Sequence, residues 1–305
     1  MNGKRWNGKG IEYNFIGELE FEGEYLNGKR NGKGKGYYNG NLEFEGKYLN
    51  GEKWIGKGKE YNYDGKIEFE GEYLDGERNG KGKEYYDDGK LKFDGEYLNG
   101  KRNGKGKEYN NNGNLIFEGE YLKGKRWKGT GKELYDDGKL KFEGEYLNGE
   151  RNGKGKEYYY DYKLIFEGEY LKGVRNGKGI EYNSYDGKIE FEGEYINGER
   201  NGKGIEYYDD GKIEFEGEYL NGERNGKGKE YYDDGNLEFE GEYLNGKRWN
   251  GKGIEYYYDY KLIFEGEYLY GQRIGKRKKS FNNDKREFER ENLNRKRKYD
   301  DYDND

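Results

Sequence analysis

Histidine, cysteine, proline and alanine are all missing from this chain of 305 residues. Without histidine or cysteine, the chain has no Ser-His or Cys-His nucleophile pair and no zinc site made of imidazole or thiolate ligands. The absence of cysteine also excludes disulfides and suits a reducing compartment. The sequence therefore excludes several common catalytic arrangements and predicts no metal and no cofactor.

Aliphatic side chains and hydroxyl groups are scarce as well. Valine and threonine occur once each, as Val174 and Thr130, and the serines are Ser184 and Ser280. Charged residues make up 40% of the chain, aromatic residues make up 18%, and there are 56 glycines. Such a chain cannot build the usual aliphatic core, so we do not expect an ordinary globular enzyme.

Long apolar runs are absent too. The N-terminal sequence MNGKRWNGKG lacks the apolar segment of a signal peptide, and no stretch approaches the ~20 apolar residues of a membrane-spanning helix. We therefore expect an intracellular protein, either cytoplasmic or at the periphery of a membrane.

What the sequence does contain is one unit, repeated. The element Phe-x-Gly-x-Tyr recurs every 23 to 25 residues, and a period in this range indicates an array of stacked supersecondary units. The element begins at Phe21, Phe44, Phe69, Phe93, Phe117, Phe142, Phe166, Phe191, Phe215, Phe239 and Phe264.

Each unit contains two runs with strand character, such as Lys212 to Leu220 and Gly226 to Tyr232. Asn-Gly separates them and Asp-Asp-Gly closes the unit, and both are strong hairpin signals because these residues tolerate a positive φ. Because the connections are short, consecutive strands must pair antiparallel. We predict an all-β, elongated, solenoid-like single meandering sheet of about eleven to twelve hairpins, roughly 100 Å long at ~4.8 Å per strand.

The repeat pattern also divides the chain. Residues 1–20 are a partial first repeat, residues 21–272 form the array, and residues 273–305 are a degenerate last repeat with a charged tail. The tail contains helix-forming residues, and a helix there would cover the open edge of the last strand.

Alternation along the first strand of a unit predicts two different faces. One face is aromatic and carries Ile213, Phe215, Gly217 and Tyr219, and the other is mostly acidic and carries Glu214, Glu216, Glu218 and Leu220. Gly217 leaves a notch between two aromatic residues, and we expect a ring from a neighbouring strand to cover it.

Two registers compete for the pairing of these strands. If Asp-Asp-Gly is a three-residue loop with Gly235 left-handed, Tyr231 falls opposite Leu237 and joins the aromatic face. The alternative pairs charges instead, Glu216 and Glu218 with Lys227 and Lys229. Because register follows the apolar face, we favour the aromatic register.

These residues resemble the MORN repeat, which has an aromatic-x-Gly-x-aromatic element, a further glycine, a Gly-x-Gly pair and an Asp-Gly turn. The corresponding residues are Phe215, Gly217, Tyr219, Gly222, Gly226, Gly228 and Gly235. The match spans roughly residues 2 to 276, although Tyr219 stands where tryptophan is frequent in the family and Asn225 where histidine is frequent. The resemblance implies a sheet of hairpins used for protein association, membrane-proximal scaffolding or phospholipid contact.

Motifs that suggest other chemistry are better explained by the repeat. Paired carboxylates such as Glu216 and Glu218 recur in almost every unit and should be solvated, whereas catalytic acids need perturbed pKa values. The string GERNGKGKE lacks the Ser or Thr of a nucleotide-binding loop, and DDGK lacks the alternating acids of a calcium loop. We therefore predict no catalytic residues.

All four tryptophans occur at one place in the repeat, as in KRWNG against the usual KRNG. We expect each to lengthen that turn by one residue and all four to lie along one edge. They are Trp6, Trp54, Trp127 and Trp249, and basic residues precede them at Arg5, Lys53, Arg126 and Arg248. Either each indole covers adjacent strands, or the Trp-Arg pairs form contacts for an interface or a membrane surface.

A tyrosine replaces the turn glycine at two places, Tyr162 and Tyr260, both in the string YYYDYK. Because a bulky residue resists a positive φ, we expect these turns to adopt another type. With Tyr158 to Tyr160 and Tyr256 to Tyr258 they form two tyrosine clusters, which either pack against the sheet or offer a platform for a sugar, a choline-like cation or a peptide.

Charge separates the array from its tail. Residues 273–305 contain 12 basic and 8 acidic residues, which gives a net charge of +4. The whole chain has a net charge of −6, so residues 1–272 have a net charge of −10. Two basic clusters suit an anionic membrane, a nuclear-import receptor or nucleic acid. They are Lys276, Arg277, Lys278 and Lys279, and Arg295, Lys296, Arg297 and Lys298. The acidic array itself argues against nucleic-acid binding along its length.

Taken together, these patterns predict a non-enzymatic scaffold that binds another protein, or itself, through a sheet edge or the aromatic face. The alternative is a peripheral membrane-binding or phospholipid-binding module that uses the basic tail and the Trp-bearing turns. An aromatic ligand-binding solenoid is a third interpretation, weakened by the presence of only four tryptophans.

Overall fold

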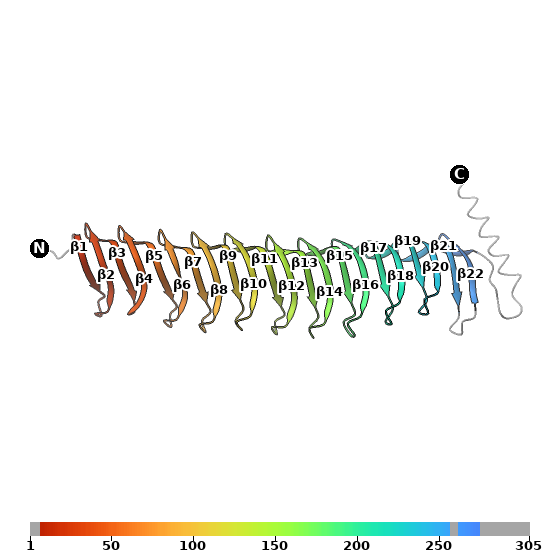
Figure 1. Cartoon of the computed structure of the whole chain (residues 1–305), viewed down its shortest axis with the longest axis horizontal. Helices are drawn as coiled ribbons and strands as arrows, with labels where there is room; N and C mark the ends of the chain where they lie inside the picture. The colour runs from red at the N-terminus through yellow and green to blue at the C-terminus, as the bar shows by residue number, and fades with distance from the viewer. Residues whose placement is uncertain (1–6, 257–261, 275–305) are drawn as a thin grey trace, which may run out of the picture. The chain divides into compact units, whose positions relative to one another are not determined.

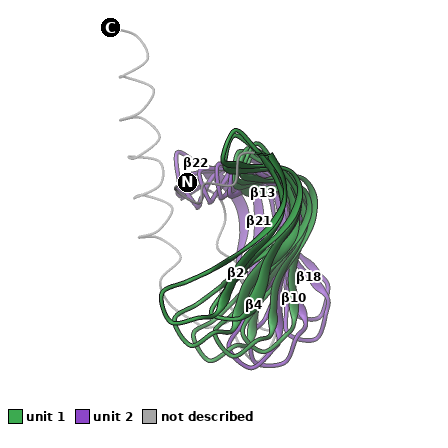
Figure 2. Cartoon of the chain, turned by 90° about the vertical axis from the view of Figure 1, so that its left-hand side faces the viewer, with its two compact units in different colours: residues 1–152 green, residues 153–305 purple. Residues whose placement is uncertain are grey.

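The computed structural model describes residues 7–256 and 262–274, which contain 23 β-strands and no helix. The predicted charged tail lies outside these residues. The chain divides into two compact units, residues 1–152 and residues 153–305, each described here by itself (Figure 2).

Residues 1–152 hold the first twelve strands and the beginning of β13 (Glu150–Tyr158). These strands are β1 (Asn7–Tyr13), β2 (Leu19–Leu26), β3 (Lys29–Tyr38), β4 (Asn41–Leu49), β5 (Glu52–Tyr61), β6 (Ile67–Leu74), β7 (Glu77–Tyr85), β8 (Leu91–Leu98), β9 (Lys101–Tyr109), β10 (Leu115–Leu122), β11 (Lys125–Leu134) and β12 (Leu140–Leu147).

Residues 153–305 hold the remainder of β13 and ten further strands. These are β14 (Leu164–Leu171), β15 (Val174–Tyr182), β16 (Ile189–Ile196), β17 (Glu199–Tyr207), β18 (Ile213–Leu220), β19 (Glu223–Tyr231), β20 (Leu237–Leu244), β21 (Lys247–Tyr256), β22 (Leu262–Leu269) and β23 (Gln272–Ile274).

Within each unit every strand pairs antiparallel with the next strand in the chain, as β18, β19 and β20 do (Figure 1). The strands bend along their length, so that the sheet of residues 1–152 is curved in cross-section (Figure 2). The prediction of an all-β antiparallel meander is confirmed. Among the described residues there is no helix of the length and apolar character needed to cross a membrane.

Two kinds of turn alternate along the meander, and both were predicted. Asn221 and Gly222 have φ values of 50° and 83°, which is the left-handed pair that a two-residue type I′ turn requires. The longer loop spans residues 233–235, where Gly235 has a φ of 88° and the Tyr232 N–H donates to the Asn236 carbonyl at 2.9 Å.

The register satisfies both of the cues that compete in the sequence. Tyr231 lies opposite Leu237, as the aromatic register requires, and Lys229 lies opposite Glu240 in the same pair of strands. A β-bulge between Glu230 and Tyr231 shifts the pairing by one residue, so the two arrangements coexist. The favoured pairing of Tyr231 with Leu237 is therefore confirmed, although the charge pairing weighed against it also occurs, with Glu216 opposite Lys229.

The same bulge corrects the assignment of the two faces. The Tyr231 hydroxyl donates to Glu216 at 2.6 Å, which places Tyr231 on the acidic face and not with the aromatic residues. Glu230, the preceding residue, lies on the aromatic face, where it accepts a hydrogen bond from Tyr243 at 2.9 Å. Nearly every repeat thus places one glutamate among its aromatic rings.

The core consists of the phenylalanine and tyrosine of each repeat. Phe215 is fully buried and Tyr219 is 4% exposed. A Cβ at Gly217 would lie 2.5 Å from the Phe215 ring and 2.8 Å from Gly228 Cα, and a Cβ at Gly228 would meet the same ring at 2.5 Å. The ring over the Gly217 notch therefore comes from the same strand, not from a neighbouring one as predicted.

The tryptophans do not lengthen the turns. Asn245 and Gly246 form the same left-handed pair before Trp249 as ordinary hairpins have, with φ values of 49° and 75°. The extra residue enters the strand instead, so β5, β11 and β21 have 10 residues where β19 has 9. In β21 the register consequently moves, and Gly251 rather than Gly253 pairs with Gly241.

The glycine pairs generate the first prediction. We expect Gly217→Val to lower the free energy of unfolding by roughly 1 to 3 kcal/mol, because its side chain overlaps Phe215 and Gly228. Distant hairpins should keep their protection against amide exchange, because repeats couple mainly to their neighbours. Hydrogen exchange measures both the loss of stability around Gly217 and the protection of distant hairpins. The control is Glu192→Ala, which changes an exposed residue. Equal loss of protection throughout the chain would contradict the prediction.

Candidate interaction surface

The aromatic face is a continuous zigzag of rings within each unit. Phe93 on β8 meets Tyr97 of its own strand edge-on, with ring centroids 5.6 Å apart, and meets Tyr121 of the next hairpin at 4.9 Å. Each phenylalanine thereby links two hairpins through the T-shaped geometry that aromatic quadrupoles favour. Because the phenylalanines are at most 2% exposed, their rings form the core and not an open platform.

A partly buried ion pair crosses the same face in nearly every repeat. Glu84 on β7 accepts a hydrogen bond from the Tyr97 hydroxyl of β8 at 2.7 Å and from Arg102 Nη2 of β9 at 2.5 Å. The Arg102 guanidinium also lies 4.2 Å from the Phe93 ring centroid. One glutamate therefore joins three successive strands, and the arginine covers the aromatic core.

We call this arrangement the Arg-Glu ladder. Its pairs in residues 1–152 are Glu12 with Arg30, Glu60 with Arg78, Glu84 with Arg102, Glu108 with Arg126, and Glu133 with Arg151. Its pairs in residues 153–305 are Glu157 with Arg175, Glu181 with Arg200, Glu206 with Arg224, Glu230 with Arg248, and Glu255 with Arg273.

The ladder changes how Glu84 and Tyr97 titrate. Burial raises the pKa of Glu84, but the hydrogen bonds from Arg102 and Tyr97 outweigh burial and hold this pKa below its usual value. Burial and the Glu84 carboxylate both raise the pKa of Tyr97. At neutral pH the glutamate is therefore charged and the tyrosine is protonated.

Sequence reasoning missed this ladder. It gave no role to the glutamate that precedes the tyrosine at the end of each second strand, yet the side chains of Glu84 and Arg102 are only 17% and 15% exposed. The available signal was that an arginine follows each Asn-Gly turn at a fixed position. The strand bulge that turns Glu230 toward the aromatic rings left no comparable trace in the sequence.

The predicted Trp-Arg contact sites are also corrected. Arg126 and Arg248 bind Glu108 and Glu230, so their guanidinium groups belong to the ladder. Trp54 and Trp127 are 37% and 39% exposed, and five strands lie between β5 and β11. The structure does not gather them into one patch.

Trp249 packs edge-on against Tyr270, with ring centroids 5.6 Å apart, as expected of an indole that covers adjacent strands. Trp6 and Arg5 lie outside the described residues. The two basic tail clusters also lie outside the described residues, and Tyr257, Tyr258 and Tyr260 do as well.

The tyrosine turn at residues 159–163 has the same type as the glycine turns. Tyr162 adopts a φ of 68°, and its N–H donates to the Tyr159 carbonyl at 2.9 Å, as the N–H of Gly235 does to Tyr232. The expectation of another turn type is wrong, because the two flanking strands fix the loop and outweigh the cost of a left-handed tyrosine, about 1 to 2 kcal/mol. Tyr162 is 59% exposed and Tyr160 is 54% exposed.

The face opposite the aromatic rings has a second repeated feature, a glutamate that caps a bulge. Gly226 is left-handed, with a φ of 90°, and the Glu218 carboxylate crosses it to accept a hydrogen bond from the Lys227 N–H at 3.0 Å. The same bond joins Glu72 to Lys81 and Glu96 to Lys105 at 3.0 Å. The Gly-Lys-Gly string is thus a strand bulge and not a phosphate-binding loop.

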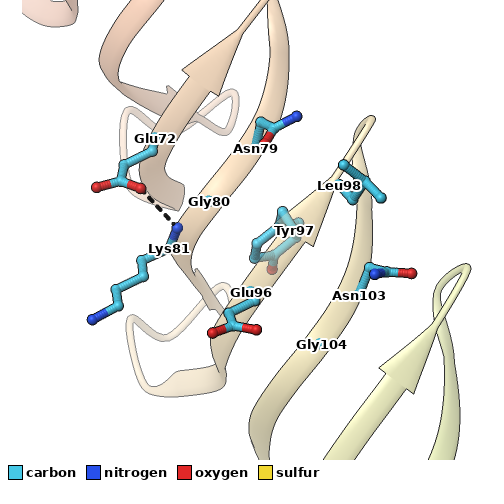
Figure 3. A pocket seen from close by; sticks show the side chains of 9 residues that line it. All are labelled: Glu72, Asn79, Gly80, Lys81, Glu96, Tyr97, Leu98, Asn103 and Gly104. Atoms are coloured by element: carbon cyan, nitrogen blue, oxygen red, sulfur yellow. Dashed lines mark hydrogen bonds between the residues drawn. The ribbon is translucent and has the colours of Figure 1, made fainter.

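A groove lies at this bulge between two hairpins of residues 1–152 (Figure 3). Its volume is about 440 Å³, and its walls include Glu72, Glu96 and Leu98 with the two bulges at Gly80 and Gly104. Neither glutamate forms an ion pair in the part of the chain that the structure describes, and Lys81 lines the groove beside them, so its charged groups are two carboxylates and one ammonium.

Leu98 is one of a set of exposed aliphatic side chains at matching positions in the hairpins, which we call the leucine edge. Each member immediately precedes the two-residue turn of its hairpin and is 37 to 50% exposed. The members are Leu26, Leu49, Leu74, Leu98, Leu122 and Leu147 in residues 1–152, and Leu171, Ile196, Leu220 and Leu244 in residues 153–305.

The fold and this repeated surface define an open antiparallel repeat sheet. Seven segments match the model described as MORN repeat, and residues 128–148 match the MORN repeat variant. The seven segments are 21–41, 69–90, 93–115, 142–163, 166–186, 191–213 and 215–237. The chain belongs to the MORN-repeat family.

Other comparisons are distant. No curated protein sequence matches the chain. Among solved structures, it is similar to TcdB2-TccC3-TEV at 10% identity and a TM-score of 0.20, covering 90% of this chain. It is also similar to a Photorhabdus luminescens Tc holotoxin pore at 11% identity and a TM-score of 0.19, covering 87%. The chain spans 16% of the length of each, and likeness at this level carries no functional argument.

The ladder generates a pH prediction. Because the folded-state pKa of Glu84 is lowered, its stabilising contribution is present above the unfolded pKa and is lost as pH falls below about 4.5. We expect Glu84→Gln to cost about 1 to 3 kcal/mol at pH 7 and to weaken the dependence of stability on pH between 5 and 3. Urea unfolding at several pH values measures this.

The control for that prediction is Glu118→Gln. Glu118 is half exposed and pairs with Lys107 at 3.1 Å on the opposite face, so this change should cost less than about 1 kcal/mol. Equal pH profiles for wild type and Glu84→Gln would contradict a stabilising role for the ladder.

One repeat lacks the ladder and generates a third prediction. Gly36 stands where the other repeats have the glutamate, Lys53 replaces the arginine, and the buried Tyr48 hydroxyl has no hydrogen-bond partner. A Cβ at Gly36 would lie 2.5 Å from the Tyr48 hydroxyl, so this ring must shift to admit a glutamate. We expect Gly36→Glu together with Lys53→Arg to raise the free energy of unfolding by about 1 to 3 kcal/mol, because after that shift the pair and the hydroxyl both gain partners. Thermal unfolding of both single variants and the double variant measures the coupling. Strictly additive effects would contradict the prediction.

Proposed function

We propose that this chain is a non-enzymatic scaffold that binds another protein through the leucine edge and the glutamates beside it. The observation that carries this proposal is the contrast between the two faces. On the aromatic face, rings, arginines and glutamates satisfy one another. On the opposite face, an exposed aliphatic side chain and a carboxylate recur in hairpin after hairpin.

Two features support binding over catalysis. Carboxylates whose pKa is lowered, such as Glu84, are held in their charged form by arginine, which is a structural use of the ion pair and not that of a general acid. The groove at Leu98 is open, and the capped bulge and the leucine that line it recur in other hairpins, whereas a catalytic site needs a unique constellation. Repetition instead suits extended contact with a partner.

The aromatic face is the weaker candidate surface. Phe93 and its counterparts are buried beneath the arginines, so a partner would meet guanidinium and carboxylate groups that are already paired. Exposed Leu98 and Leu220 have no such covering, and each is 49% exposed. Burying aliphatic area of this kind stabilises association by about 25 cal/mol per Å² before the entropic costs of binding.

The fourth prediction tests this surface by site-specific photo-crosslinking in the native cell. A photoreactive side chain at Leu98 should yield a discrete adduct with a partner protein. The same side chain at Leu115, which is 38% exposed and lies near the other end of its strand, should yield little or none. Equal crosslinking at both positions, or none at Leu98, would contradict the proposal.

The alternative function is peripheral membrane binding through the tail. Its support is the composition of residues 276–279 and 295–298, eight basic residues that would each add about 1 kcal/mol near an anionic surface. Flotation with anionic and neutral liposomes at low and physiological salt, using the intact chain and a chain ending at Gln272, distinguishes the two functions. Binding that is salt-sensitive and lost on truncation favours the membrane.

A further inference from the structure

We infer that Asn148 is a site of spontaneous covalent modification, where the side-chain amide is lost through a succinimide ring and aspartate or isoaspartate remains. The inference goes beyond the proposed function, because the reaction needs neither a partner protein nor an enzyme. It rests on the Asn-Gly sequence of one turn and on two contacts to the preceding hairpin that this turn lacks.

The chemistry uses only the turn and water. The backbone nitrogen of Gly149 gives up its proton and attacks Cγ of Asn148, and the new C–N bond closes the succinimide ring. The side-chain nitrogen leaves as ammonia, taking up that proton, and water then opens the ring at either carbonyl. Glycine permits the attack because no Cβ obstructs it. The product carries a new carboxylate beside Leu147, a member of the leucine edge.

Matching turns in other hairpins hold the glycine N–H. The turn at Asn148 and Gly149 has φ values of 56° and 81°, close to the 50° and 83° of the Asn221–Gly222 turn. The Gly222 N–H, however, donates to the carbonyl of Arg200 in the preceding hairpin at 2.9 Å, whereas the Gly149 N–H has no acceptor among the residues that the structure describes. Other Asn-Gly turns also have the bond, at Gly51, Gly100, Gly198 and Gly246.

An extra residue in the preceding strand accounts for the missing bond. Trp127 lengthens β11, and a Cβ at Gly149 would lie 3.2 Å from the carbonyl oxygen of Arg126. A Cβ at Gly222 would have no atom within 4 Å. The carbonyl of β11 has therefore moved out of line with the glycine N–H and toward the position that a Cβ would take.

Three further turns show the same relation and its limits. Gly76 follows β5, which carries Trp54, and the Gly76 N–H also has no acceptor among the described residues. In β21 the tryptophan carbonyl takes the place of the arginine carbonyl, because Trp249 accepts from the Gly271 N–H at 2.9 Å. Gly173 lacks the bond without a tryptophan in the preceding strand, but a lysine stands before it and has no amide to lose.

A second contact is missing from the same turn. At several other turns the N–H of the first turn residue donates to an asparagine side chain of the preceding hairpin, as Tyr270 does to Asn250 Oδ1 at 3.0 Å. Lys128 stands at the corresponding position of β11, in KRWKG where β21 has KRWNG, and a lysine side chain has no acceptor. The turn at residues 148–149 therefore lacks both contacts.

The missing contacts favour the reaction because the ring closes only after the peptide plane between Asn148 and Gly149 rotates. In the left-handed conformation the glycine nitrogen points away from Cγ, so ψ of the asparagine must change first. A glycine N–H that is bound to the preceding hairpin opposes both this rotation and the loss of its proton. One such hydrogen bond slows the reaction roughly two- to ten-fold. Both residues are exposed, so water reaches the ring.

The chain contains its own matched control. Residues 142–159 and 215–232 have identical sequences, so Asn148 and Asn221 differ in their surroundings in the fold and not in their local sequence. Trypsin releases the two in peptides of different length, because the nearest lysine before each lies at a different distance. The full chain is incubated in mildly alkaline buffer, either folded or unfolded in urea, and mass spectrometry of the tryptic peptides measures the loss of each amide.

In the folded chain we expect Asn148 to lose its amide roughly two- to ten-fold faster than Asn221, because only Asn221 must first break the glycine hydrogen bond. In urea we expect equal rates. Asn39 is the positive control, because it also precedes a left-handed turn glycine, Gly40, whose N–H has no acceptor in the described part of the chain.

Two variants test the cause. Deletion of Trp127 together with Lys128→Asn turns KRWKG into KRNG, the string of the ordinary repeats, and we expect Asn148 then to react as slowly as Asn221. Trp127→Leu keeps the extra residue and should leave the Asn148 rate unchanged. Circular dichroism and thermal unfolding show that each variant remains folded.

Equal rates at Asn148 and Asn221 in the folded wild-type chain would overturn the inference, and this comparison needs no variant. A faster Asn148 whose rate the deletion leaves unchanged would support the modification site and contradict the role given to the inserted tryptophan. Crosslinking at Leu98 tests the proposed function independently, because it reports on a partner and not on this turn.

Discussion

The contact between a phenylalanine ring and a pair of facing glycines makes this fold possible. A single-layer sheet has no second layer to bury its apolar residues, so burial must come from the sheet itself. Phe215 achieves it by lying directly on Gly217 and Gly228, where no Cβ holds the ring away from the backbone. The phenylalanine is therefore fully buried in a sheet one strand thick.

The ladder completes this burial and links the hairpins. Arg224 stacks at 4.4 Å from the Phe215 ring centroid and binds Glu206 of the preceding hairpin. The arginine thus replaces the missing layer with a charged side chain whose aliphatic stem and planar head cover the ring. Because the charge is paired, the cost of its partial burial is offset.

The different roles of the two faces follow from this packing. On one face, aromatic, basic and acidic groups are satisfied internally, which favours a structural role. The other face must carry the side chains that alternate with them, and these include Leu220 and Glu218 at the turn end of each hairpin. A repeated surface therefore follows directly from a repeated core, and it is this surface that the proposed scaffold function uses.

The sequence by itself determined the hairpins, the turns and the aromatic core, because each depends on a local signal. Asn221 and Gly235 mark the two turns, and the regular recurrence of residues such as Phe215 marks the core. Only the tertiary structure decided which side chains share a face. The bulge before Tyr231 reverses the alternation and turns Glu230 toward the rings, while Trp249 enters a strand and moves its register. Even Tyr162 takes a glycine's conformation, because neighbouring strands fix a loop more strongly than one residue's own preference.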